Sequence, residues 1–261
     1  MTELEFYFHT GVEFSAPVSG HTFALHCLPM EDDAQTLQSY AVRLEPGAEY
    51  ALHKDGFGSW LVCGSCQEPH QVFRYDTHGI VQVEGNAKAK PVNPVLKQFT
   101  PLTAMTEELE ALWQSLPLEG KSPQEQAELL NGAAAGALHY VPGVTGLTTT
   151  AGQALALGSG VCQDYTHILL ALARRSGFAA RYCMGLVPGE GATHAWAEIA
   201  LPDGWHGYDP TFACDAGEDH VRFAVGRDAA DCRAERGIFR GMAEQTLDTG
   251  MRLNVRENRT R

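Results

Sequence analysis

The spacing of hydrophobic residues changes once along this chain, near residue 90 of 261. Before that point, short runs of β-branched and aromatic residues alternate with turn residues, which is typical of strands. After that point, apolar residues recur at the three- and four-residue spacing of helices, and further strands follow. The pattern predicts an α+β fold and argues against the regular alternation of an α/β sheet.

The first part predicts a β-rich N-terminal domain at residues 1–90. The segment from Asn86 to Pro101 carries three prolines and is interpreted as the connection to a second domain at residues 91–261. The expected strands of the first domain are Glu5–His9, His21–Leu28, Ser39–Leu44, Gly58–Cys63, Gln71–Tyr75 and Gly79–Val83.

The second part begins with helices. Thr106 and Ser122 are typical helix caps, and Pro123 suits the first helical position. A loop at Val141–Thr150 precedes a helix that opens at Ser159-Gly160 and ends at Gly177. The strands expected after it are Ala180–Leu186, His194–Ala200, Trp205–Tyr208, Val221–Val225 and Leu253–Val255.

The charge balance limits the partners that this chain can bind. Lys and Arg number 19 against 32 Asp and Glu, which gives a formal net charge of −13. A nucleic acid or an anionic membrane surface needs a basic face, so neither is expected as a partner. The sequence has no apolar run long enough to cross a bilayer and does not begin like a signal peptide, which predicts a cytoplasmic protein. The seven cysteines, an odd number at irregular spacing, are then expected to be thiols.

Cys162 is the first residue whose context suggests chemistry. It lies at a predicted helix start, where unpaired N–H groups and the helix dipole stabilise a thiolate and could hold an oxyanion. Gly158 and Gly160 precede it and would allow a substrate to approach the sulfur.

His194 and Asp209 complete a possible triad. His194 begins one predicted strand and Asp209 ends the next, and Pro202-Asp203-Gly204 between them is a plausible hairpin turn. The hairpin would bring the imidazole and the carboxylate to the same end of the sheet. The histidine could then serve as the base, with the aspartate fixing its tautomer. Each residue alone would more often be a packing or surface residue; the combination indicates catalysis.

At these residues the chain resembles the transglutaminase-like superfamily of papain-type thiol enzymes, and within it the bacterial transglutaminase-like cysteine protease group. The stretches that carry the resemblance are GSGVCQDYTHILLALARRSGFAARYCMG, THAWAEIALPDGWHGYDPT and HVRFAVGRDAADCRAERGIFRG, with EPHQVFRYDTHG in the N-terminal part. The resemblance implies a papain-like core, with a cysteine-bearing helix on an antiparallel sheet, behind a small β-rich domain. It also implies that Cys162 is the nucleophile, His194 the base and Asp209 its orienting partner.

These features predict a thiol enzyme of acyl transfer that acts on a peptide or glutamine-type amide and requires no metal or organic cofactor. Hydrolysis, as by a cysteine peptidase or amidase, is favoured because water is abundant. A protein-glutamine transglutaminase, another acyltransferase with a Cys-His-Asp triad, and a non-catalytic interaction module remain as alternatives. The natural substrate, the oligomeric state and the role of the β-rich domain stay open.

Several further residues have a functional and a structural interpretation. Trp196 shares a strand face with His194 and could wall the substrate cleft or belong to the core. Gln153 could supply a second oxyanion donor. Cys63-Gly-Ser-Cys66 could be half of a zinc site or a redox pair, but a hairpin turn flanked by the two cysteines is the simpler interpretation. Asp164 suits the helix dipole, and His167 faces away from Cys162 and is a poorer base than His194.

Overall fold

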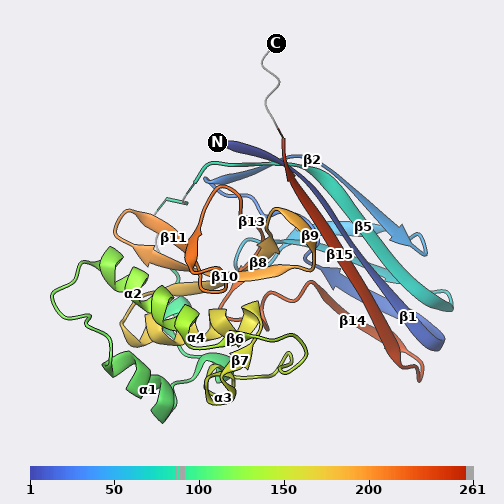
Figure 1. Ribbon diagram of the computed structural model, residues 1–261. Coiled ribbons are helices and arrows are strands. Elements are labelled where there is room, and N and C mark those ends of the chain that lie inside the picture. The colour runs from blue at the N-terminus through green and yellow to red at the C-terminus, as the bar shows by residue number, and fades with distance from the viewer. Residues whose placement is uncertain (86, 89–91, 257–261) are drawn as a thin grey trace.

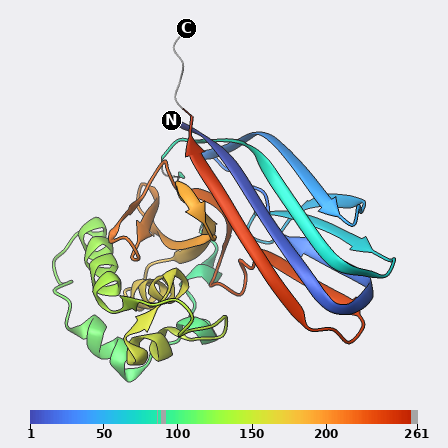
Figure 2. The same ribbon diagram turned by 45° about the vertical axis from the view of Figure 1, so that its right-hand side comes forward.

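The computed structural model describes residues 1–85, 87, 88 and 92–256, and it contains two large antiparallel sheets with a group of helices. Figure 1 shows the helices gathered on one side of the molecule and a sheet of long strands on the other. The smaller sheet lies between them. The turned view in Figure 2 shows the long strands side by side as one twisted layer that stands beside the helical part.

The larger sheet is organised around β1, which runs without a break from Thr2 to Leu25. Its residues alternate between buried and exposed for much of this length, as expected where one face of a strand packs on a core. Two separate strands were expected in this region, and two more in the region of the single strand β5, because turn residues interrupt the apolar pattern. The other strands from this part of the chain are β2 (Gln35–Glu45), β3 (Tyr50–Lys54), β4 (Trp60–Cys66) and β5 (His70–Val83).

The end of the chain returns to this same sheet. β14 (Glu235–Arg240) pairs with the second half of β1, and β15 (Gln245–Val255) pairs with its first half. The sheet is therefore not confined to residues 1–90, although the first expected strands all contribute to it. The expected division at residue 90 itself falls outside the described residues. Pairing over such a sequence separation leaves no local signal in the sequence.

The interpretation of Cys63-Gly64-Ser65-Cys66 as a hairpin turn is wrong, because all four residues lie inside β4. Gly64 is required by close packing. A Cβ at this position would lie 2.5 Å from the Phe23 ring and 2.7 Å from the backbone oxygen of Glu49. Both cysteines are free thiols.

The helical part follows two short 3-10 turns, η1 (Pro94–Lys97) and η2 (Pro101–Thr103). Helix α1 is Glu107–Gln114 and begins after Thr106, whose hydroxyl accepts the Leu109 N–H. Helix α2 is Pro123–Gly136 and begins with a capping box between Ser122 and Glu125. Both starts agree with the sequence analysis. Helix α3 (Ala151–Leu157) was not expected, because it is short and its apolar pattern spans only two turns.

Helix α4 (Cys162–Arg175) is the central helix, and most of its residues are buried. It packs against β8 and β10 of the smaller sheet. The strand order of that sheet is β12-β11-β10-β8-β13, with antiparallel neighbours throughout. The strands are β8 (Ala180–Leu186), β10 (His194–Leu201), β11 (Gly204–Asp209), β12 (Cys214–Ala216) and β13 (Val221–Gly226).

A buried ionic network joins the smaller sheet to the N-terminal part. Arg222 of β13 is 3% exposed, and its guanidinium donates to Asp32 at 2.9 Å and lies 3.4 Å from Glu198. The Gln35 side chain donates to the Arg222 carbonyl at 2.8 Å and accepts the Arg222 N–H at 2.9 Å. Separating the two parts would leave these buried charges without partners, which is strongly destabilising. The network therefore holds the smaller sheet against the N-terminal part. In the described part of the chain, no helix has the length and apolarity to cross a membrane.

Candidate active site

Cys162 is the first residue of α4, and Val161 is the N-cap. The preceding helix α3 ends at Gly158 with a left-handed backbone (φ 67°), a conformation that favours glycine. Ser159-Gly160 forms the short strand β7 beside His139-Tyr140, which is β6. The thiol therefore lies at the helix start that the sequence predicts, with the unpaired N–H groups of the first turn around it.

Asp164 fixes the backbone that carries Cys162. Its Oδ2 atom accepts the Val161 N–H at 2.8 Å and the Thr145 hydroxyl at 2.6 Å. Gly160 packs directly on this carboxylate, because a Cβ there would lie 2.6 Å from Oδ2. Asp164 thus caps α4 and also ties the loop before α3 to the helix start that carries Cys162, a stronger structural role than the expected favourable position on the dipole.

The hairpin of β10 and β11 brings His194 and Asp209 together. The two strands pair from Ala197 opposite Tyr208 to Leu201 opposite Gly204, which confirms the expected turn. His194 Nε2 lies 2.6 Å from Asp209 Oδ2, and since a carboxylate accepts only, the imidazole nitrogen is the donor. The other oxygen, Oδ1, accepts the backbone N–H groups of Thr211 at 2.9 Å and Phe212 at 3.2 Å.

The protonation of this pair follows from its contacts. Burial alone would lower the pKa of His194, but its hydrogen bonds to Asp209 and to the Cys162 sulfur raise it to about 9. Burial alone would raise the pKa of Asp209, but hydrogen bonds from His194 and His220 hold it well below its usual range. Because Nε2 serves Asp209, Nδ1 is the ring nitrogen left for the thiol.

Two aromatic rings hold the His194 imidazole. The Phe212 ring stacks on it with centroids 4.9 Å apart, and the Trp196 ring lies nearly parallel to it at 6.3 Å. Phe212 is 60% exposed and covers the imidazole from the solvent side, whereas Trp196 is 1% exposed. Of the two interpretations of Trp196, its burial supports a core residue that packs beside His194. The sequence analysis did not single out Phe212, because no sequence pattern indicates that a residue three positions after Asp209 would cover the His194 ring.

His220 is a second imidazole on the same carboxylate. Its Nε2 lies 3.3 Å from Asp209 Oδ2 and its Nδ1 lies 2.6 Å from Asp219 Oδ1, and the ring is 6% exposed. The sequence analysis missed this residue. The strand directions explain its position: β10 and β13 both run antiparallel to β8, so His194 at the start of β10 and His220, one residue before β13, lie at the same end of the sheet. This explanation requires the strand order, which the sequence does not reveal.

Gln153 and His167 both have structural partners. The Gln153 side-chain oxygen accepts the Thr150 N–H at 3.0 Å in the capping box of α3. His167 is fully buried and accepts the Ala229 N–H at 3.2 Å, and burial lowers its pKa to about 4. Within residues 1–85, 87, 88 and 92–256, no group of three or more His, Cys, Asp or Glu side chains could hold a metal ion.

Two tyrosines lie near the thiol. Burial first, and then the neighbouring Cys162, raise the pKa of Tyr140 above its ordinary value, and the same two causes raise that of Tyr182 further. Tyr140 on β6 is 55% exposed, whereas Tyr182 on β8 is 4% exposed. Cys162 therefore has one exposed phenol and one buried phenol in its surroundings.

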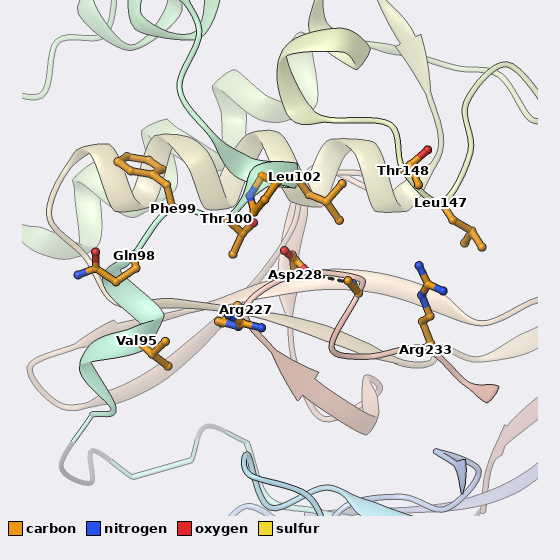
Figure 3. Close-up of a pocket in the computed structure, with 12 residues that line it drawn as sticks. Val95, Gln98, Phe99, Thr100, Leu102, Leu147, Thr148, Arg227, Asp228 and Arg233 are labelled. Atoms are coloured by element: carbon orange, nitrogen blue, oxygen red, sulfur yellow. Dashed lines mark hydrogen bonds between the residues drawn. The ribbon is translucent and has the colours of Figure 1, made fainter. Parts of the chain in front are cut away.

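A cavity of about 470 Å³ opens between the two sheets next to this site. We call it the intersheet cavity. Gln163, which follows Cys162, and Thr193, which precedes His194, belong to its lining. A second cavity of about 350 Å³ adjoins it and shares Leu147 and Arg233 with it (Figure 3).

Comparison with known proteins identifies matching family models and a solved structure with the same fold. Residues 111–210 match the family model of the transglutaminase-like superfamily, and residues 4–82 match the bacterial transglutaminase-like N-terminal region. An uncharacterized protein of Mycobacterium leprae is 26% identical over 264 residues, which cover 92% of this chain and 94% of that protein. An uncharacterized protein of Mycobacterium tuberculosis is 32% identical over 124 residues, which cover 41% of this chain and 40% of that protein.

Among solved structures, a candidate cysteine protease from Cytophaga hutchinsonii has a TM-score of 0.80 at 18% identity. The similarity covers 99% of this chain and 92% of that one. At this level of identity the similarity establishes the fold, including the β-rich N-terminal region. Together with the matching family models, it supports a cysteine-based enzyme.

Proposed function

Because the chain belongs to the transglutaminase-like superfamily, we propose that it is a cysteine amide hydrolase with Cys162, His194 and Asp209 as its catalytic triad. The observation that carries the proposal is the 2.6 Å contact between His194 and Asp209, with the Cys162 sulfur as the second partner of His194. The reaction is acyl transfer from a peptide or glutamine-type amide to water.

In the first half of the reaction, the Cys162 thiolate attacks the amide carbonyl carbon. The backbone N–H groups at the start of α4 stabilise the developing oxyanion. His194 carries its proton on Nδ1 and gives it to the amide nitrogen as the carbon–nitrogen bond breaks. The amine leaves, and the acyl group stays on the sulfur as a thioester.

In the second half, His194 accepts a proton from water as the water oxygen attacks the thioester carbonyl. The carbon–sulfur bond breaks, the acid product leaves, and the thiolate–imidazolium pair is restored. Asp209 keeps the imidazole in one orientation and stabilises its charged form throughout. The raised pKa of His194, about 9, supports this role, because the ring then holds its proton at neutral pH.

The test is product analysis with a mixture of peptides that includes glutamine and C-terminal amides, with and without added methylamine. Hydrolysis yields free acids, and transfer to the amine yields methylamides, which differ in mass. We expect acids to predominate, and we expect Cys162→Ser to abolish both products while Cys63→Ser, a substitution of a thiol on β4, retains them. Methylamides as the main product would favour the transglutaminase alternative. Neither product under any condition, together with an unreactive Cys162, would favour the interaction module.

A further inference from the structure

The intersheet cavity lies where a substrate held by the triad would extend. Its lining includes residues adjacent in sequence to both Cys162 and His194, and it includes Tyr182, whose hydroxyl interacts electrostatically with Cys162. The cavity therefore borders the chain segments that carry the thiol and the imidazole. A volume of about 470 Å³ is ample for one side chain of a substrate, together with part of its backbone.

The walls of the cavity are largely apolar. The larger sheet contributes Phe8 and Val12 from β1 and Leu247 from β15, and the smaller sheet contributes Tyr182 and Met184 from β8. Such walls favour an aliphatic or aromatic stem over a short polar side chain, because the stem leaves water on binding.

Glu235 contributes a carboxylate to this lining, beside neutral polar residues and Arg233. Its Oε2 atom is buried and has no hydrogen-bond partner among the described residues. Burial raises the pKa of this carboxyl to about 7. The Tyr75 hydroxyl is buried in the same lining, where it interacts with Thr10, and Glu235 contributes to its raised pKa. Buried polar atoms are normally paired, so the unpaired Glu235 oxygen beside this cavity indicates a missing ligand group.

Arg233 and Leu147 lie where the two cavities meet. Figure 3 shows the Arg233 side chain directed towards the loop that carries Leu147 and Thr148. Leu147 is 64% exposed, and Arg233 is also exposed. The Arg233 charge is therefore at the solvent-exposed entrance, where water screens it, whereas the Glu235 oxygen is buried in the intersheet cavity.

We propose that the intersheet cavity binds a substrate side chain whose aliphatic stem ends in a primary ammonium group, as in lysine, with Glu235 as the acceptor. The proposal rests on the proposed function, since it assigns the substrate class of that same site. An ammonium group is a donor with three N–H bonds, so it can satisfy both Glu235 and the Tyr75 oxygen. The net charge of −13 adds a general attraction for a cationic substrate.

The experiment measures how fast Cys162 is modified by three chloromethyl ketones, which are derived from lysine, norleucine and glutamate. Each is acetylated at the α-amino group, so that the lysine side chain keeps its ammonium group. Norleucine has nearly the lysine stem without the ammonium group. Modification is followed by mass spectrometry of the intact protein and its peptides. Each rate is divided by the iodoacetamide rate of the same protein, because iodoacetamide is too small to need the cavity.

The lysine reagent is expected to react about 10-fold or more faster than the norleucine reagent, the effect of one charged hydrogen bond. In Glu235→Gln this ratio should fall towards one, and in Tyr75→Phe it should fall less. Glu5→Gln removes a carboxylate from the outer face of β1 and serves as the matched control, in which the ratio should persist.

Equal rates for lysine and norleucine, or a ratio unchanged in Glu235→Gln, would overturn the proposal. Preference for the glutamate reagent would overturn it in favour of an anionic substrate held by Arg233. In each of these cases a rapid reaction of Cys162 with iodoacetamide leaves the proposed function intact. If Cys162 reacts no faster than the other thiols with any reagent, the proposed function and this proposal both fail.

Discussion

Two buried carboxylates in this molecule have opposite surroundings. Asp209, in the triad, is fully buried and accepts from two imidazoles and two backbone N–H groups. Glu235, in the intersheet cavity, has a buried oxygen that finds no hydrogen-bond partner in the part of the chain that the structure describes. The pKa of Asp209 lies well below its usual range, because the hydrogen bonds outweigh burial, whereas burial alone raises that of Glu235 to about 7.

The two carboxylates therefore differ in whether the protein itself supplies all their hydrogen-bond donors. The hydrogen bonds to Asp209 are complete in the protein alone, which suits its proposed role as a preorganised catalytic group. The Glu235 environment lacks a donor, and the proposed substrate would supply it. Substitutions in the first region should therefore reduce activity or stability, whereas removal of the Glu235 charge should stabilise the protein.

The largest effect is expected at the base that connects the triad. His194→Ala should reduce amide turnover at least about 10³-fold, because the leaving amine loses its proton donor and the thiolate its partner. Steady-state hydrolysis of the best peptide from the product screen measures this. His53→Ala, at an exposed position of β3, is the matched control and should retain the activity.

Asp209→Ala should reduce turnover about 10²-fold and lower the free energy of unfolding at pH 7 by about 3 kcal/mol, since it leaves the donors around it unpaired. Asp209→Asn keeps an acceptor and should lose less of both. The depressed pKa of Asp209 means that its stabilisation is present above about pH 4 and disappears as the pH falls. Denaturant unfolding measures the stability, and a gap between wild type and Asp209→Ala that stays constant down to pH 2 would argue against this linkage.

Glu235→Gln should make the protein more stable at pH 8, by about 2 kcal/mol. The folded carboxyl holds its proton up to about pH 7 against an ordinary value of 4.5, so the wild type loses stability as the pH rises through this window. The full shift corresponds to about 3.4 kcal/mol, and we reduce it because the carboxyl is only partly shielded from water. Urea unfolding at pH 5 and pH 8 is the measurement, with Glu5→Gln as control. Equal stability of variant and wild type at pH 8 would show that ionisation of Glu235 does not destabilise the folded protein.

His220→Gln should have the smallest effect, a loss of about 5-fold in kcat with little change in KM, because the amide still donates to Asp209. His220 acts through Asp209, so it is a positioning residue and its loss should shift the pH profile of kcat. His220→Phe, which removes the donor, should shift the profile further. A fall in kcat without any shift would indicate that His220 only supports the fold.

Much of this structure could be predicted from patterns of residues that are close together in the sequence. The glycine-flanked helix start predicts the position of Cys162 and the strand–turn–strand pattern predicts the hairpin, because both depend on residues close in the chain. The strand Ala180–Leu186 was predicted with the bounds that the structure gives. The catalytic roles of Cys162, His194 and Asp209 stay predictions until activity is measured.

Contacts between distant segments could not be predicted. Nothing in residues 235–255 indicates that β14 and β15 pair with β1, and the intersheet cavity exists only because they do. Gly64 in β4 misled the interpretation because close packing on Phe23 and a turn both select glycine. Glu235 is an ordinary charged residue in the sequence, and its burial depends on the way the two sheets meet.

The most direct test of the triad is the rate at which iodoacetamide modifies Cys162 between pH 5 and pH 9, read by mass spectrometry in wild type and His194→Ala. A working thiolate–imidazolium pair predicts that Cys162 reacts faster than the other cysteines at pH 6. It also predicts that this reactivity disappears in His194→Ala, whose Cys162 should react as slowly at pH 6 as the other cysteines. The same rate in both proteins at pH 6, or no selectivity for Cys162, would contradict the account.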